Sequence, residues 1–195
     1  MLRYPEHSNT LFNIMTYDPG TNAGGLAVFT LDAKENSLVS SISNTFYSDK
    51  MLSRDLCVET NQGEVMTKIQ SQCVNISNML NNYNVSVFCC ETPFFNPTRP
   101  GAYGVLMRLN QAIRTTVINY NPLTTFNEYA PRFIKMTVCG LDKGIDKDTM
   151  RRHVLSRTDL NYVGDTPINQ LGPDAIDALG IGITEIKTNY KGILI

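Results

Sequence analysis

The sequence lacks the features that zinc-scaffolded and membrane-embedded proteins need. Only two histidines are present, His7 and His153, and none of the five cysteines belongs to a CxxC pair, so a Cys/His zinc site is not expected. No apolar run approaches the ~20 residues that cross a bilayer. Residues 1–10 carry Arg3 and Glu6 in place of the apolar core of a signal peptide. We therefore expect reduced thiols, no membrane partner and a cytoplasmic location, in a bacterium or a virus-infected host cell, with an organelle left open.

The chain is also poor in charge, but the charges that it has are unevenly distributed. Charged residues make up 18% of the sequence against 42% hydrophobic residues, a composition typical of globular proteins. Residues 92–157 hold ten basic and four acidic residues, a net charge of +6, and the remainder holds seven basic and 14 acidic residues, a net charge of −7. This asymmetry favours a polyanion such as nucleic acid on one face. Ordinary clustering of surface charge is the alternative.

Length and hydrophobic patterning predict one α/β domain over residues 11–190, preceded by a flexible lead of residues 1–10. Alternating and all-apolar runs predict strands at 11–18, 24–31, 37–47, 85–91 and 123–128. Apolar residues at helical spacing predict helices at 62–83, 101–120, 131–138, 146–155 and 173–186. Irregular structure is expected at 46–61, 92–100 and 158–171.

The order of these elements predicts the architecture of the sheet. Short loops join the first three strands into an antiparallel meander, whereas helices connect the later two strands, as parallel crossovers require. We therefore expect a mixed five-stranded sheet of three antiparallel meander strands and two parallel strands, with helices on both faces. This arrangement resembles the ribonuclease-H-like fold.

Four acidic residues stand at the ends of predicted elements. Asp18 ends the first strand and Glu91 the fourth, while Asp174 and Asp177 lie three residues apart in the first turns of the last helix and point to the same side. Turn formation explains Asp18 by itself, and the helix dipole explains Asp174 and Asp177. Glu91 is less expected at the end of so apolar a strand, because a carboxylate near the core is costly unless it is paired. In the predicted sheet, however, the first and fourth strands are neighbours, so all four carboxylates are expected to meet.

Four carboxylates in one place repel each other, and a divalent cation removes that repulsion. Sites built of oxygen ligands alone suit Mg²⁺, which retains several waters and accepts phosphate oxygens as further ligands. Two such ions about 4 Å apart activate a water and stabilise the leaving oxygen of a phosphodiester. Together with the basic stretch, the carboxylates predict a metal-dependent nuclease.

Four segments carry a resemblance to a known family. They are YDPGTNAGGLAVF at 17–29, VFCCETPFF at 87–95, FIKMTVCG at 133–140 and GPDAIDALGIGI at 172–183. In this order they resemble the RuvC family of Holliday junction resolvases, and the last segment, a D-x-x-D-A-L helix start, is the most specific of the four. The sequence between them, above all at 46–61 and 158–171, is dissimilar, which favours a phage or viral member.

The resemblance implies a homodimeric endodeoxyribonuclease that makes paired nicks across a four-way DNA junction and leaves 5′-phosphate and 3′-hydroxyl ends. It implies that Asp18, Glu91, Asp174 and Asp177 bind Mg²⁺, with Mn²⁺ able to substitute, and that the helix at 101–120 forms the dimer. It further implies catalytic roles for Lys135 and Lys147, with Lys143 as the alternative to Lys147. Phe94 or Phe95 is expected to stack on bases at the branch, and phosphate contacts are expected from Arg99, Arg108, Lys143, Arg151 and Arg152.

Other interpretations stay open from the sequence. A nuclease of the same fold that cuts flaps, forks or RNA has the same carboxylates, and so does a junction-binding protein that does not cut. An ATP-binding lobe of the actin and sugar-kinase type also begins with an Asp-x-Gly-Thr turn, but it needs two lobes and leaves the basic stretch unexplained. The sequence determines neither a preferred cleavage sequence nor a helicase partner.

Overall fold

The computed structural model describes residues 10–48, 61–95, 97–98, 100–140 and 145–194. Almost all of the expected N-terminal lead, most of the expected irregular segment 46–61, and the predicted DNA-binding residues Arg99 and Lys143 lie outside these ranges. None of the helices in the described ranges has both the length and the apolar character needed to cross a lipid bilayer.

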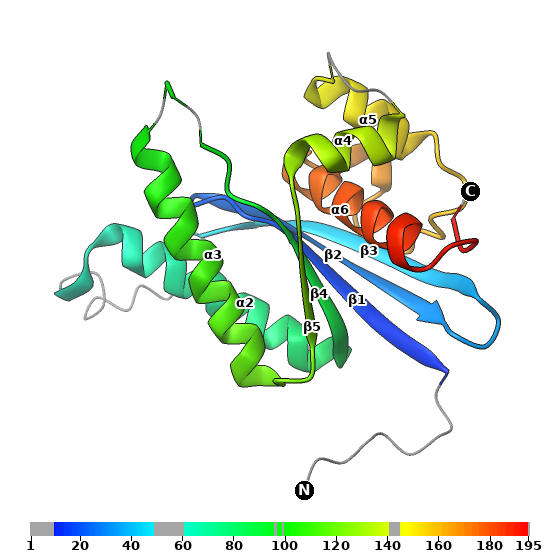
Figure 1. Ribbon diagram of the computed structural model, residues 1–195, viewed down its shortest axis with the longest axis horizontal. Coiled ribbons are helices and arrows are strands. Elements are labelled where there is room, and N and C mark those ends of the chain that lie inside the picture. Colours follow the sequence, from blue (N-terminus) through cyan, green and yellow to red (C-terminus); the bar gives the residue numbers. More distant parts are fainter. Residues whose placement is uncertain (1–9, 49–60, 96, 99, 141–144, 195) are drawn as a thin grey trace, which may run out of the picture.

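A five-stranded sheet forms the centre of the molecule (Figure 1). Its strands are β1 (Leu11–Asp18), β2 (Ala23–Asp32), β3 (Ser37–Tyr47), β4 (Val85–Glu91) and β5 (Thr125–Tyr129), in the spatial order β3-β2-β1-β4-β5. The pairs β1–β2 and β2–β3 are antiparallel, and β1–β4 and β4–β5 are parallel. The predicted mixed sheet is therefore confirmed, and β1 and β4 are neighbours as expected.

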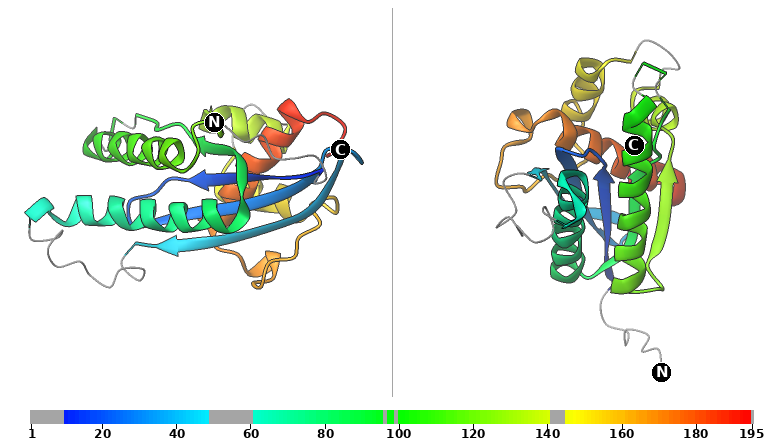
Figure 2. Two further views of the ribbon diagram at one scale, coloured as in Figure 1. Left: turned by 90° about the horizontal axis from the view of Figure 1, so that it is seen from below. Right: turned by 90° about the vertical axis from the view of Figure 1, so that its left-hand side faces the viewer.

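Helices cover both faces of this sheet. On one face lie α2 (Glu64–Tyr83) and α3 (Pro100–Tyr120), which contact each other and run side by side in Figure 2. On the other lie α4 (Pro131–Cys139), α5 (Lys147–Leu155) and α6 (Pro173–Asn189) (Figure 1). Successive side chains of a strand point to opposite faces. Thus Ile14 joins the core under α6, while its neighbour Met15 joins the core under α2 and α3.

Some boundaries differ from the sequence-based prediction, for local reasons. The fifth strand starts at Thr125 and not at Leu123, because Asn121 forms a turn in which its side chain accepts from the Leu123 amide and its carbonyl from the Thr124 amide. Helix α6 continues three residues beyond the predicted end, to Asn189. The predicted loop at 158–171 contains a short 3₁₀ helix, Ile168–Gln170. None of these differences alters the order of the elements.

Candidate active site

The first two carboxylates lie at one edge of the sheet because β1 and β4 run in parallel. Tyr17 of β1 is paired with Cys90 of β4, so the next residue of each strand, Asp18 or Glu91, ends its strand at the same edge. In both strands the four residues before the acid are buried, because helices cover both faces of the sheet. The sheet thus brings together two acids that are 73 residues apart in sequence.

Helix α6 brings the other two acids to that edge. It begins with Gly172 as N-cap and Pro173 in its first turn. Two buried hydroxyls then bind its first turns to the sheet: Ser43 of β3 donates to the Ala175 carbonyl at 2.8 Å, and Thr16 of β1 to the Ala178 carbonyl at 2.7 Å. These hydrogen bonds hold the segment that carries Asp174 and Asp177 against the strand that carries Asp18.

The start of α6 lies so close to β2 that glycine is required there. Gly25 is paired with Asp18 across the β1–β2 ladder. A Cβ added to Gly25 would lie 1.8 Å from the carbonyl oxygen of Asp174 and 3.0 Å from the amide nitrogen of Ala175. Both contacts are with backbone, which has no alternative rotamer, so a side chain at this position would displace the first turn of α6.

We therefore expect Gly25→Ala to destabilise the fold by about 2 kcal/mol, within the range for overpacking, and to displace Asp174, which would reduce any nuclease activity of the kind that the sequence predicts. Gly180→Ala in α6 is the matched control, because a Cβ there would meet no described atom closer than 3.5 Å, which is ordinary van der Waals contact. The control should stabilise the chain slightly, since alanine favours a helix over glycine by about 1 kcal/mol. Urea unfolding measures both effects. Equal stability of the two variants would contradict the close packing of α6 on β2.

The carboxylates border a cavity of about 670 Å³. Four acids line it, three from β1, β4 and α6 and one at the N-cap of α5, together with three basic side chains from α4 and α5 and an aromatic residue after β4: Asp18, Glu91, Asp177, Asp146, Arg132, Lys135, Lys147 and Phe94. Asp174 is not in the cavity wall, but it contacts a lysine that is. The cavity thus combines carboxylates with the basic groups that bind phosphate.

The acids from β1, β4 and α6 raise one another's proton affinity. Burial and then the negative charges of Glu91, Asp177 and Asp174 hold the pKa of Asp18 well above its ordinary value. Burial and the charge of Asp177 raise the pKa of Glu91 to about 7. Burial is also the main cause that raises the pKa of Asp177, which Asp174 raises further. The pKa of each of these acids thus depends on burial first and then on the charge of at least one of the others, so the acids share one electrostatic environment.

Two lysines partly offset this negative charge. The ammonium of Lys147, the first residue of α5, lies 3.8 Å from a carboxylate oxygen of Asp174 and 3.7 Å from one of Asp177. Its side chain is 67% exposed, so these ion pairs contribute little stability by themselves. Lys135 lowers the pKa of Glu91 and of Asp177, and its ammonium donates to the Ile145 carbonyl at 3.1 Å.

The donor set fits a hydrated divalent cation better than a closed metal cage. Within the described ranges, no three His, Cys, Asp or Glu side chains are grouped closely enough to form a ready-made metal site. Mg²⁺ does not need such a group, because it retains several waters and takes one or two protein carboxylates. The mutual repulsion among Asp18, Glu91 and Asp177 is the property that bound Mg²⁺ would relieve.

The predicted base-stacking residues lie in the loop that follows β4. Phe94 is 62% exposed and lines the cavity, and Phe95 is 52% exposed. The ring of Phe95 meets that of Tyr103 in α3 edge to face, with 5.6 Å between centroids. Exposed aromatic rings beside a cavity that also contains basic side chains are suited to stacking on nucleic-acid bases.

The predicted phosphate-binding arginines occupy different environments. Arg108 lies exposed on α3 and Arg152 exposed on α5, where it donates to the Thr149 hydroxyl at 3.1 Å. Arg151 donates to the Leu171 carbonyl at 2.7 Å and also to the Asn169 carbonyl. Its guanidinium therefore holds the segment before α6 in place, a structural contact that the sequence did not suggest.

One basic residue of the cavity was not identified from the sequence. Arg132, in the first turn of α4, lines the cavity three residues before Lys135. Residues three apart lie on the same side of a helix. The spacing of three residues between Arg132 and Lys135, which places them on the same side of the helix, would have identified Arg132 from the sequence.

Comparison with known proteins agrees with this arrangement. No protein-family model matches the chain. A curated protein of Vibrio atlanticus (strain LGP32), named crossover junction endodeoxyribonuclease RuvC, is 28% identical over 134 residues, which cover 68% of this chain and 70% of that protein.

Solved structures extend the similarity to most of the chain. Thermus thermophilus RuvC superposes with a TM-score of 0.64 at 16% identity, over 94% of this chain and 98% of its own, and also matches in complex with a Holliday junction substrate. The yeast mitochondrial Holliday junction resolvase has a TM-score of 0.59 at 8% identity, over 88% of this chain and 76% of its own. At such identities the structures show the fold alone. The chain is thus RuvC-like in sequence over two thirds of its length and in fold over most of it, which confirms the resemblance that its four motifs indicate.

Proposed function

We propose that this protein is a structure-specific DNA endonuclease that resolves four-way junctions by Mg²⁺-dependent hydrolysis of phosphodiester bonds. The observation that carries this proposal is the meeting of Asp18, Glu91 and Asp177 in one cavity with Arg132, Lys135 and Lys147. The acids suit a divalent cation, and the basic groups suit the phosphate on which it acts. The sequence similarity to the Vibrio crossover junction endodeoxyribonuclease supports the same chemistry.

In this proposal Asp18, Glu91, Asp174 and Asp177 hold Mg²⁺, which Mn²⁺ is able to replace. When bound, the metal supplies Lewis-acid stabilisation of the phosphate and a more acidic water. The protein's own groups do the rest. Lys135 and Lys147 bind the negatively charged phosphate, and the partly buried carboxylates hold the cation at the cavity wall.

Paired nicks need two active sites, so we propose that the protein acts as a homodimer. The face of α3 offers a surface for a second copy: Met107 and Ile118 are 45% and 53% exposed and lie on the same side of the helix. At Gly101 and Gly104, near the start of α3, an added Cβ would meet no described atom of the same chain. Their lack of a side chain would allow the backbone of a partner to approach closely.

The branch itself would provide selectivity. The exposed ring of Phe94 lines the cavity, and the exposed ring of Phe95 follows it in the chain. Both rings are available to stack on the bases that are unstacked at a junction. Base–aromatic stacking is worth about 1–3 kcal/mol per base and tolerates any sequence. We also propose a cytoplasmic site of action, which agrees with the free thiols of Cys73, Cys89, Cys90 and Cys139.

A cleavage panel tests the proposal. Four-way, three-way, flap and linear duplex DNA are incubated with the wild-type protein in Mg²⁺ and in EDTA. We expect symmetric, ligatable nicks on opposite strands of the four-way junction and no cleavage in EDTA. Cleavage unchanged in EDTA would contradict the metal mechanism. Preferred cleavage of flaps would identify a nuclease of the same fold with another substrate, and unpaired nicks would contradict the homodimer.

A further inference from the structure

The segment immediately after Asp18 is a compact four-residue turn, residues 19–22, between β1 and β2. Pro19 restricts Asp18 to extended backbone conformations. A Cβ added to Gly20 would lie 2.2 Å from the Ala23 carbonyl oxygen, so the chain turns back on itself within a small space. The position of this turn therefore helps to decide where the Asp18 carboxylate lies.

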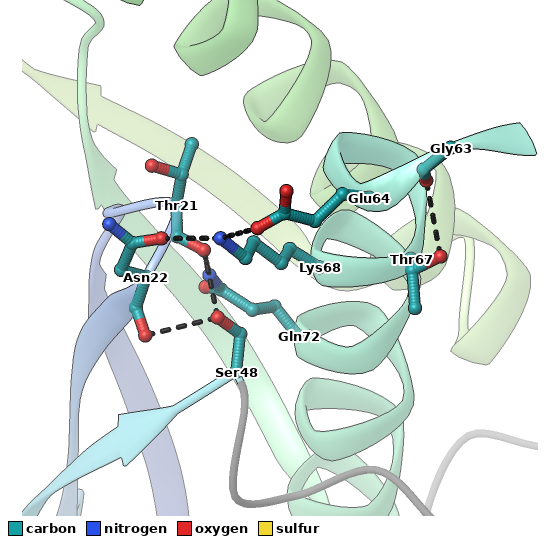
Figure 3. Close-up of polar contacts among 8 residues, drawn as sticks. All are labelled: Thr21, Asn22, Ser48, Gly63, Glu64, Thr67, Lys68 and Gln72. Carbon is teal, nitrogen blue, oxygen red and sulfur yellow. Dashed lines mark hydrogen bonds and ion pairs between the residues drawn. The ribbon is translucent and has the colours of Figure 1, made fainter. Parts of the chain in front are cut away.

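Side chains from α2 and from Ser48, the residue that follows β3, hold this turn (Figure 3). The side-chain amide of Gln72 donates to the Thr21 carbonyl at 3.2 Å and also to the Gly20 carbonyl. The hydroxyl of Ser48 lies 2.9 Å from the Thr21 carbonyl oxygen and 3.0 Å from that of Asn22. Three successive backbone carbonyls of the turn, those of Gly20, Thr21 and Asn22, thus accept hydrogen bonds from side chains.

A third side chain that holds the turn is that of Lys68, one helical turn before Gln72. Its ammonium donates to the side-chain oxygen of Asn22 at 2.9 Å and forms an ion pair with Glu64 at 2.5 Å (Figure 3). One side of α2 therefore presents two donors to the turn, one buried and one at the surface.

Burial of a glutamine at position 72 has a cost that an apolar residue would avoid. Gln72 is 2% exposed, and its side-chain oxygen is buried with no hydrogen-bond partner among the described residues. An unpaired buried amide oxygen destabilises a fold, because it has lost its hydrogen bonds to water without gaining others. A methionine of similar size would fill the space without that cost, so the two donated hydrogen bonds are the property that distinguishes glutamine here.

We infer that Gln72 is a positioning residue for the proposed metal site, because its amide group fixes the turn 19–22 and with it the orientation of Asp18. The inference rests on the proposed function, in which Asp18 is a metal ligand. Gln72 does not touch the metal or the DNA in this account. It acts through the backbone that follows the ligand.

Mn²⁺ binding without DNA, measured by electron paramagnetic resonance well below the unfolding temperature, tests this inference. Gln72→Met keeps the shape and removes both donors, so we expect the Mn²⁺ dissociation constant to rise about tenfold. Thr67→Val is the matched control on the same helix. It removes a largely buried hydroxyl that donates to the Gly63 carbonyl at 3.1 Å, away from the turn (Figure 3). The control should lower the unfolding temperature and leave Mn²⁺ affinity within about twofold of wild type.

Lys68→Met keeps the test decisive if Gln72→Met does not fold. The side chain of Lys68 is 26% exposed, and its removal breaks the hydrogen bond to Asn22. Loss of a positive charge would by itself strengthen Mn²⁺ binding, so the expected weakening, about threefold, has the opposite sign. Unchanged Mn²⁺ affinity in Gln72→Met would overturn the inference. If Gln72→Met does not fold, Lys68→Met is measured in its place, because Lys68 also holds the turn; unchanged Mn²⁺ affinity in Lys68→Met would then overturn the inference. A wild-type chain that binds no Mn²⁺ would refute the proposed function itself, and the inference with it.

Discussion

Asp18→Asn is expected to reduce the rate of junction cleavage at least about 10³-fold, which corresponds to about 4 kcal/mol of transition-state stabilisation. Asparagine keeps the shape of the side chain but supplies a neutral and weaker metal ligand. Asp18 is the acid on which Glu91, Asp177 and Asp174 all act electrostatically, so it lies at the centre of the proposed metal site. Single-turnover cleavage of a labelled four-way junction in saturating Mg²⁺ measures the effect.

Binding of the junction should survive this substitution. The change removes negative charge from the cavity, and phosphate binding depends on the positive charge around it. Asp148→Asn in α5 is the matched control, because it removes the same charge from an exposed residue next to Lys147. The control should cleave within about twofold of wild type, since surface charges contribute weakly. Cleavage by Asp18→Asn at the wild-type rate would exclude Asp18 as a metal ligand.

The second large effect is a loss of stability with rising pH when no divalent metal is present. Burial and the charge of Asp177 raise the pKa of Glu91 from 4.5 to about 7 in the folded protein. Between these values the folded state holds a proton that the unfolded state has lost, so the free energy of unfolding falls as pH rises. The raised pKa values of Asp18 and Asp177 act in the same direction.

We expect the free energy of unfolding in EDTA to fall by about 2–3 kcal/mol between pH 5 and pH 8. Addition of Mg²⁺ at pH 8 should restore most of it, because the cation stabilises the ionised acids. Glu91→Gln should show a weaker pH dependence and exceed the wild type in stability at pH 8 in EDTA. Denaturant unfolding at several pH values measures all three. A wild-type stability that is independent of pH over this range, or equal to that of Glu91→Gln, would contradict the raised pKa that burial and neighbouring charge give to these acids.

The fold was predictable from the sequence because its elements have local patterns. The alternating residues of 37–47 and the apolar run at 85–91 predicted β3 and β4 with the bounds that the structure has. The fifth strand was misplaced by two residues at its start because Asn121 forms a turn whose hydrogen bonds depend on the preceding helix. Boundaries are decided by such capping contacts, which residue periodicity does not contain.

The candidate site was predictable in part. The meeting of Asp18 and Glu91 followed from the order of the elements, because parallel strands that are neighbours end at the same edge. The contact of Lys147 with Asp174 and Asp177 depends on how α5 packs on α6. The positions of these residues along the chain did not predict that packing. Arg151 illustrates the limit: its charge suggested DNA, but in the structure its guanidinium donates to two carbonyls before α6.

The sequence by itself determined which residues form strands and helices, which acids end them and where positive charge collects along the chain. These properties are local, and each is encoded in a short run of residues. Only the tertiary structure decided that Gly25 must leave space for α6, that Gln72 holds the turn after Asp18, and that the acids raise one another's pKa. Those relations depend on distances between segments far apart in sequence, and packing of the whole domain fixes these distances.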